Sequence, residues 1–84
     1  MIPIPKPSVG EKLLMNAAVI TCTGQYQLYI ENYKTVQSLT EKRVEVQTKT
    51  CLVIVEGIDL MASYYTKEEM KITGRIQNIQ YVER

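Results

Sequence analysis

The feature that most constrains this chain is a change of hydrophobic period at residue 17. Before it, Pro3, Pro5 and Pro7 occupy alternate positions, a spacing that favours an extended arm and excludes a helix. After it, apolar residues recur at every second position, as in strands with one buried face. Short runs of this kind, with turn signals every roughly eight to twelve residues, are typical of all-β domains. We therefore predict an all-β fold.

The expected architecture is a single small domain of about seven to eight short, mostly antiparallel strands, a meander that forms a small sandwich or β-roll. The run 51–55 is apolar on both faces, so we place it at the centre of the sheet. In the last run, the apolar positions shift from Ile76 to Ile79 and Tyr81, which predicts a bulge near Gln77 and Asn78. The strands are expected at 17–23, 26–31, 35–39, 43–48, 51–55, 60–64, 69–72 and 75–82.

Glycines follow three of the apolar runs. Gly24, Gly57 and Gly74 are each expected to supply the positive φ of a tight hairpin turn. The segments 40–46 and 66–72 also resemble each other at a 26-residue offset, since each starts with Thr and a charged turn and continues as an alternating strand. We attribute this echo to the hairpin pattern and do not interpret it as a solenoid repeat.

The 84 residues have room for one core. We divide them into a Pro-rich arm with a short helical or irregular lead-in, residues 1–16, and an all-β domain, residues 17–84. Cys22 and Cys51 lie in apolar runs and are expected to be reduced and buried. The chain shows neither a secretory signal pattern nor the ~20 apolar residues of a membrane span. We expect a cytoplasmic protein, with a peripheral position at a membrane as a further option.

The inventory of catalytic side chains is small. The sequence contains no His, which excludes Ser-His and Cys-His nucleophile pairs and removes the commonest metal ligand. Glu68 and Glu69 with Glu41 could form an acid–base pair, but beside Lys67 and Lys71 they are interpreted as a solvated, charge-balanced face. We therefore expect a protein that is not an enzyme and that uses no cofactor, no metal and no small-molecule substrate.

All six aromatic residues are tyrosines. Tyr26, Tyr64 and Tyr81 fall on apolar faces and are expected in the core. Tyr29, Tyr33 and Tyr65 are expected at the surface, where tyrosine suits a protein interface. They also suit a β-barrel that stacks the bases of single-stranded nucleic acid. The formal charge of +1 makes nucleic acid the less favoured partner, because such domains usually carry a basic excess.

Several short elements together carry a family resemblance. They are an apolar strand ending in Gly at 20–24, the Leu-Tyr-Ile-Glu-Asn of 28–32, the apolar run ending in Gly at 52–57 followed by Leu60, and the Ile-Thr-Gly-Arg-Ile-Gln-Asn-Ile-Gln-Tyr of 72–81. This combination, which covers about residues 18–82, resembles the YabP/YqfC family of sporulation proteins, and most closely its YqfC branch. The Pro-rich start departs from the family pattern.

The resemblance implies a non-enzymatic role in spore formation in endospore-forming bacteria, in the mother-cell cytoplasm. It implies a structural protein that acts by protein–protein interaction and docks on a membrane-bound sporulation partner; formation of a homo-oligomer is a further expectation. Glu31 and Asn32 match the family motif, and Asn32 is interpreted first as a turn residue. The candidate interaction surface consists of Tyr29, Glu31, Asn32, Tyr33 and Tyr65.

Overall fold

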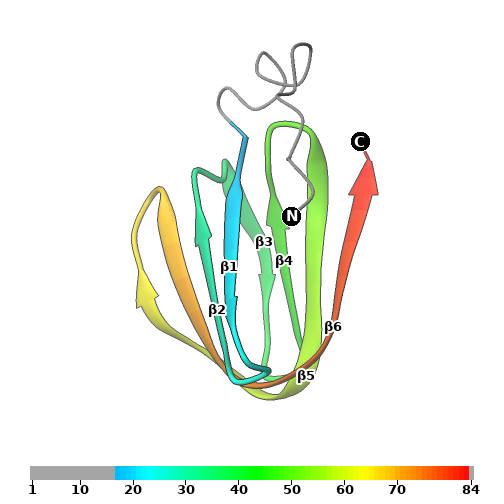
Figure 1. Cartoon of the computed structure of the whole chain (residues 1–84). Helices are drawn as coiled ribbons and strands as arrows, with labels where there is room; N and C mark the ends of the chain where they lie inside the picture. Colours follow the sequence, from blue (N-terminus) through cyan, green and yellow to red (C-terminus); the bar gives the residue numbers. More distant parts are fainter. Residues whose placement is uncertain (1–16, 84) are drawn as a thin grey trace, which may run out of the picture.

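The computed structural model describes residues 17–83, which form six antiparallel strands in one sheet (Figure 1). The order in the sheet is β1-β2-β6-β5-β4-β3. The all-β prediction is confirmed, and the predictions for residues 1–16 lie outside the described residues. The strands are β1 (Val19–Thr23), β2 (Gln27–Glu31), β3 (Thr35–Leu39), β4 (Arg43–Gln47), β5 (Cys51–Tyr65) and β6 (Glu69–Glu83).

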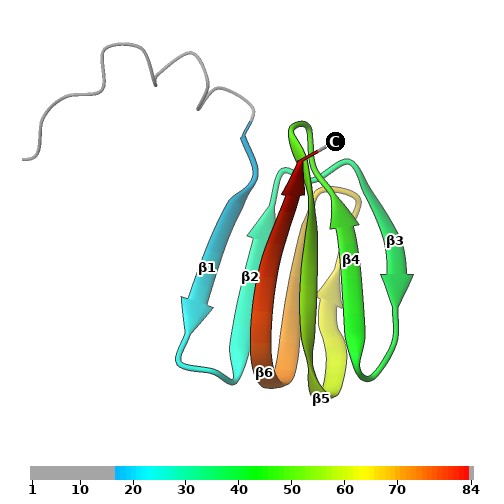
Figure 2. The same ribbon diagram turned by 90° about the vertical axis from the view of Figure 1, so that its right-hand side faces the viewer.

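Two long, bent strands fold this single sheet into two layers (Figures 1 and 2). β5 and β6 have 15 residues each, and each replaces two of the eight predicted short strands. β2 pairs with the first half of β6, from Glu69 to Thr73, whereas β4 pairs with the first half of β5. One layer therefore contains β1, β2 and the hairpin formed by the second half of β5 and the first half of β6. The other contains β3, β4 and the remaining halves.

Two glycines at the bend allow β5 and β6 to come close together. A Cβ on Gly57 would overlap the carbonyl oxygen of Arg75, and a Cβ on Gly74 would lie 2.6 Å from the carbonyl oxygen of Asp59. Gly74 has a φ of 136°, as expected, but it lies inside β6. The prediction of tight hairpin turns at Gly57 and Gly74 is therefore wrong, because these glycines serve a close backbone approach within continuous strands.

The predicted bulge in the last strand is confirmed. Glu56 pairs with Asn78 and the next residue, Gly57, pairs with Ile76, so Gln77 is the extra residue. This insertion shifts the side-chain alternation by one position, so that Ile76 before it and Ile79 after it both pack against the core.

The core lies between the two layers. In β5, all four residues from Leu52 to Val55 are buried, which confirms the central placement of this run. Both cysteines are free, but Cys22 is exposed and Cys51 is half-buried. The expectation of buried cysteines is wrong for Cys22 because β1 is an edge strand. The core cluster is Leu28, Ile30, Tyr33, Val44, Val46, Val53, Val55, Leu60, Met70 and Ile72.

The sequence echo has a local chemical cause. In the β3–β4 turn, the Thr40 hydroxyl accepts a hydrogen bond from the Arg43 backbone N–H at 2.9 Å. In the β5–β6 turn, the Thr66 hydroxyl accepts one from the Glu69 N–H at 3.0 Å. The β4–β5 turn has the same arrangement at Thr48. The resemblance between the segments therefore comes from a threonine that organises each hairpin turn.

Candidate interaction surface

The structure separates the five predicted surface residues into three environments. Tyr29 and Glu31 point outward from β2, because Leu28 and Ile30 between them point into the core. Tyr65 is exposed at the end of β5, as expected. Asn32 and Tyr33 lie in the β2–β3 loop and stabilise its structure.

Asn32 fixes this loop to two other parts of the chain. Its φ of 64° lies in the left-handed region, which confirms its interpretation as a turn residue. Its backbone N–H donates to the carbonyl oxygen of Glu68 at 2.7 Å, and its side-chain amide donates to that of Ala17 at 3.2 Å. Asn32 therefore joins the β5–β6 turn to the residue that leads into β1.

Tyr33 is buried, so the expectation that it is exposed is wrong. Its side chain retains 6% exposure, and its hydroxyl donates to the carbonyl oxygen of Thr66 and, at 3.3 Å, to that of Glu69. Burial of the hydroxyl, with a smaller contribution from Tyr65, raises the pKa of Tyr33. The loop crosses the end of the sandwich here, so this tyrosine closes the core instead of facing solvent.

Three of the other tyrosines were expected in the core and are exposed instead. Tyr26 lies in the β1–β2 turn. The register shift between Ala62 and Tyr64 reverses the alternation, so Tyr64 points outward and is 47% exposed. Tyr81 remains on the inner face, opposite Val53, but it lies on an edge strand and is 61% exposed. These three predictions are wrong because the alternation of apolar residues in the sequence shows neither the bulge at Ser63 nor the point at which a layer ends.

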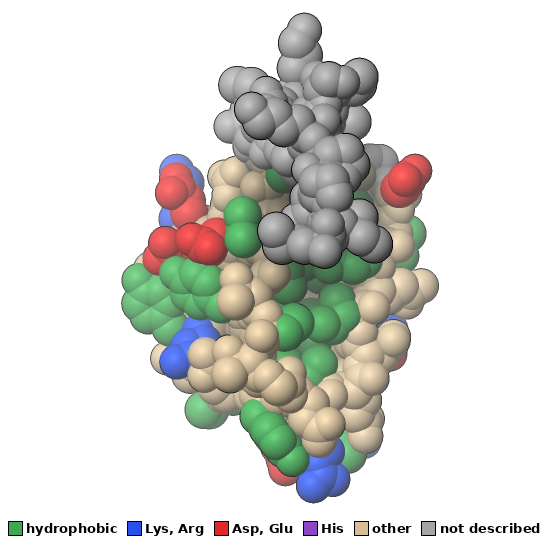
Figure 3. Space-filling model, viewed as in Figure 1, with side chains coloured by type: hydrophobic (Ala, Val, Ile, Leu, Met, Phe, Trp, Pro, Cys, Tyr) green, Lys and Arg blue, Asp and Glu red, His purple; other side chains and the backbone are tan. Residues whose placement is uncertain are grey.

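Side chains from three strands form one polar and aromatic surface on the outer face of the first layer. The register places Glu31 of β2 opposite Glu69 of β6, and Lys71 of β6 between Tyr29 of β2 and Tyr64 of β5. In Figure 3, acidic side chains adjoin hydrophobic ones on the left flank of this layer. We call this surface the tyrosine–carboxylate patch; its members are Tyr29, Glu31, Tyr64, Glu69 and Lys71.

Glu69 interacts with Tyr29 and Tyr64 and lies opposite Glu31. The Tyr64 hydroxyl donates to its carboxylate at 3.5 Å. Partial burial, a hydrogen bond with Glu69 and the negative charges of Glu69 and Glu31 raise the pKa of Tyr29 to about 12. Like charges directly opposite in a sheet are destabilising, so the Glu31–Glu69 pair is a position where a cation would be favourable.

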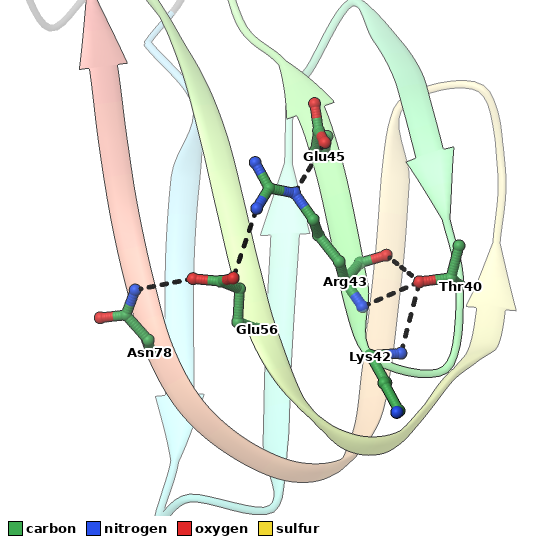
Figure 4. Close-up of polar contacts among 6 residues, drawn as sticks. All are labelled: Thr40, Lys42, Arg43, Glu45, Glu56 and Asn78. Carbon is green, nitrogen blue, oxygen red and sulfur yellow. Dashed lines mark hydrogen bonds and ion pairs between the residues drawn. The ribbon is translucent and has the colours of Figure 1, made fainter.

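The outer face of the second layer has its charges paired (Figure 4). Arg43 contacts Glu45 at 2.8 Å and Glu56 at 3.3 Å, and the Asn78 amide donates to Glu56 at 3.2 Å. The hydrogen bond that the Arg43 guanidinium donates to the Glu45 carboxylate is the main reason that the pKa of Arg43 is raised. Between residues 17 and 83, Arg43 makes the only ion pairs. Within that range, the carboxylates of the tyrosine–carboxylate patch therefore have no ion-pair partner.

Sequence reasoning found Tyr29 and Glu31 but not the other members of the patch. Glu69 was interpreted as part of a solvated face and Tyr64 as core, because both interpretations used neighbours in the sequence. Their grouping depends on the pairing of β2 with β6, which joins residues about forty positions apart. The alternating Glu69, Lys71 and Thr73 of β6 were the one available signal of a polar outer face.

Two further classes of site are absent from the described part of the chain. From residue 17 to residue 83, no three His, Cys, Asp or Glu side chains come together in an arrangement that suits a metal ion. Over the same residues, there is no helix with the length and hydrophobicity to cross a bilayer.

Comparison with known proteins identifies the family. The chain is 28% identical over 71 residues to the Bacillus subtilis (strain 168) protein named "Uncharacterized protein YqfC", an alignment that covers 84% of this chain and 76% of that protein. No solved structure gives a significant match. The fold gives each residue that carried the family resemblance a structural role: Ile30 is core, Asn32 is the left-handed turn residue, and Gly74 occupies the bend. The model of the YabP family matches residues 15–84, and the chain belongs to this family.

Proposed function

We propose that this chain is a non-enzymatic protein that acts in sporulation by protein–protein assembly and docks on a membrane-bound partner. Membership of the YabP family implies the association with sporulation. The tyrosine–carboxylate patch supports the assembly role, since it combines exposed tyrosine with two carboxylates that lack an ion-pair partner within residues 17–83.

The observation that carries the proposal is the opposed pair Glu31 and Glu69. A Lys or Arg of the partner that enters between them relieves the like-charge repulsion and replaces it with two attractive contacts. Tyr29 and Tyr64, which flank Lys71 at the next outward position of β6, provide aromatic surface beside the pair for the stem and the charge of that residue. The partner is therefore expected to present a basic segment.

Nucleic acid fits this surface less well. The alternative function used Tyr29, Tyr33 and Tyr65 as a stacking platform, but Tyr33 is buried. Carboxylates beside Tyr29 also repel a phosphate backbone.

The test is a pull-down of the tagged full chain from crosslinked sporulating cells, with and without nuclease. The tested variant carries Glu31→Gln and Glu69→Gln, and a charge-matched control carries Glu41→Gln and Asp59→Asn at exposed positions outside the patch. We expect one membrane protein in near-stoichiometric yield, insensitive to nuclease and lost only in the patch variant. Recovery that depends on nucleic acid, or equal recovery by both variants, would contradict the proposal.

A further inference from the structure

The second half of β6 is a sheet edge. From Asn78 to Glu83 it pairs with β5 on one side. β2, which flanks the first half of β6, ends its pairing at Thr73. Within residues 17–83, no strand pairs with the other side of this segment. Figures 1 and 2 show it as the outermost ribbon of its layer.

From Asn78 to Glu83, this edge has few of the features by which proteins protect an exposed strand. Such features are bulges, Pro and inward or edge charges, Lys above all. The other edges formed by the second layer and the long hairpin are irregular: β3 has a register shift at Val36, and the second half of β5 has shifts at Ile58 and Ala62. In contrast, six consecutive residue pairs join 78–83 to β5 without interruption. Glu83 is the one charged residue in that segment.

The inner face of the same segment carries apolar surface out to the edge. Ile79 lies opposite Val55 and Tyr81 opposite Val53, and both valines are fully buried. Ile79 is only partly buried against the core, and Tyr81 is largely exposed. A further strand beside β6 would extend the layer and cover both side chains.

We propose that a second copy of this chain supplies that strand, paired antiparallel across a two-fold axis at Gln80. In this register Gln80 faces its own copy and Ile79 faces Tyr81 of the second copy. Two symmetric pairs of a β-branched and an aromatic side chain result, a favourable combination in sheets.

The charge pattern of this segment favours a second copy as the occupant, because no like charges would face each other. An antiparallel two-fold pairing places each residue of the segment opposite its mirror position, and like charges there would be destabilising. Here the regular pairing runs from Asn78 to Val82, which are uncharged, and Glu83 falls beside the uncharged bulge residue Gln77 of the second copy. The contact joins the same surface on both copies, so the assembly closes as a dimer. The dimer contact includes no residue of the tyrosine–carboxylate patch, so it is independent of the proposed partner.

The first test is sedimentation equilibrium of the full chain over a range of concentrations. We expect a monomer–dimer equilibrium. Tyr81→Ser should weaken it by about tenfold, since each dimer loses two symmetric contacts. Tyr64→Ser is the matched control, an exposed tyrosine on the outer face of the other layer, and it should leave the equilibrium unchanged.

The second test examines the register. Gln80→Lys and Gln80→Glu each place like charges face to face, so each should dimerise more weakly than the unmodified chain at low salt. An equimolar mixture should form a heterodimer about 2- to 10-fold more stable than either homodimer. The same two changes at Gln37, an exposed residue of β3, should produce no preference for the mixture.

Three outcomes would overturn the proposal. A full chain that remains monomeric up to about 1 mM has no such association of measurable strength. Polymers that grow with concentration would show head-to-tail contacts in place of a closed two-fold pair. A dimer that is insensitive to Tyr81→Ser and to the charge pair at Gln80 would form through another surface.

Discussion

In both halves of β6, side chains alternate between the inner and the outer face, but the strands that flank the two halves differ. In the first half, Met70 and Ile72 are completely buried, because β2 and β5 flank the strand on both sides. In the second half, β5 is the one adjacent strand among residues 17–83, and Ile79 and Tyr81 on the inner face remain partly or largely exposed. The comparison shows that alternation determines which side chains share a face, whereas neighbouring strands determine how deeply that face is buried.

β5 shows the same division in reverse order. Its first half lies between β4 and β6 and is buried on both faces from Leu52 to Val55. Its second half pairs with β6 alone and ends in the exposed Tyr64 and Tyr65. Each long strand therefore contributes one central and one edge segment.

The largest expected effect is a difference between two paired residues, one in a central segment and one in an edge segment. Ile54 in the central half of β5 pairs with Gln80 in the edge half of β6. Ile54→Asp buries an unpaired charge, which costs several kcal/mol, and we expect no soluble folded protein. Gln80→Asp should fold normally, because that side chain is exposed. Circular dichroism with thermal melting measures both, and a cooperative melt for Ile54→Asp would refute the comparison.

A second pair of changes compares the two halves of β6 directly. Ile72→Ala leaves a cavity between flanking strands and should lower the free energy of unfolding by about 2–5 kcal/mol. Ile79→Ala removes the same atoms from a partly exposed site and should cost about 1 kcal/mol. Urea denaturation gives both values. The measurement is made at low protein concentration, because the proposed dimer would bury Ile79 at high concentration. Equal losses at low concentration would show that Ile79 is as buried in solution as Ile72.

The bend between the halves gives a third prediction. Gly74→Val places a side chain at a φ of 136° and against the carbonyl oxygen of Asp59. We expect a loss of about 2–3 kcal/mol in unfolding free energy. The control is Gly24→Asn, at a φ of 55° with open space around the Cβ position, which should cost only a few tenths of a kcal/mol. An unchanged urea midpoint for Gly74→Val would mean that the bend is elsewhere.

The smallest effect concerns the patch beside the central half of β6. The pKa of Tyr29 is raised to about 12, so its contribution to stability is complete below pH 10 and is lost as the pH rises from about 10 to 12. Tyr29→Phe should remove this step from the alkaline decrease in stability. The tyrosinate absorbance of Glu69→Gln should show one tyrosine that titrates at lower pH. An unchanged titration curve in Glu69→Gln would show that Glu69 does not raise the pKa of Tyr29.

Local patterns predicted more of the fold than of the candidate surface. The bulge at Gln77, the turn at Asn32 and the central run of β5 each depend on a few consecutive residues, so the sequence contains their signals. The threonine turns also have a local signal, because the echo between segments 40–46 and 66–72 reflects the Thr that organises each turn. The exposure of Tyr33 and Tyr64 was predicted wrongly, because it depends on a loop contact and on a bulge that the alternation does not show.

What the sequence determined by itself is the all-β class, the identity of the strand faces and the family motif, because periodicity and turn chemistry act over a few residues. Only the tertiary structure decided that two long strands bend and divide one sheet into two layers. It also decided that Glu31 lies opposite Glu69 and that, among residues 17–83, the second half of β6 lies at an edge of the sheet. The physical reason is that pairing between distant strands depends on the closure of the whole core, and no local segment contains that information.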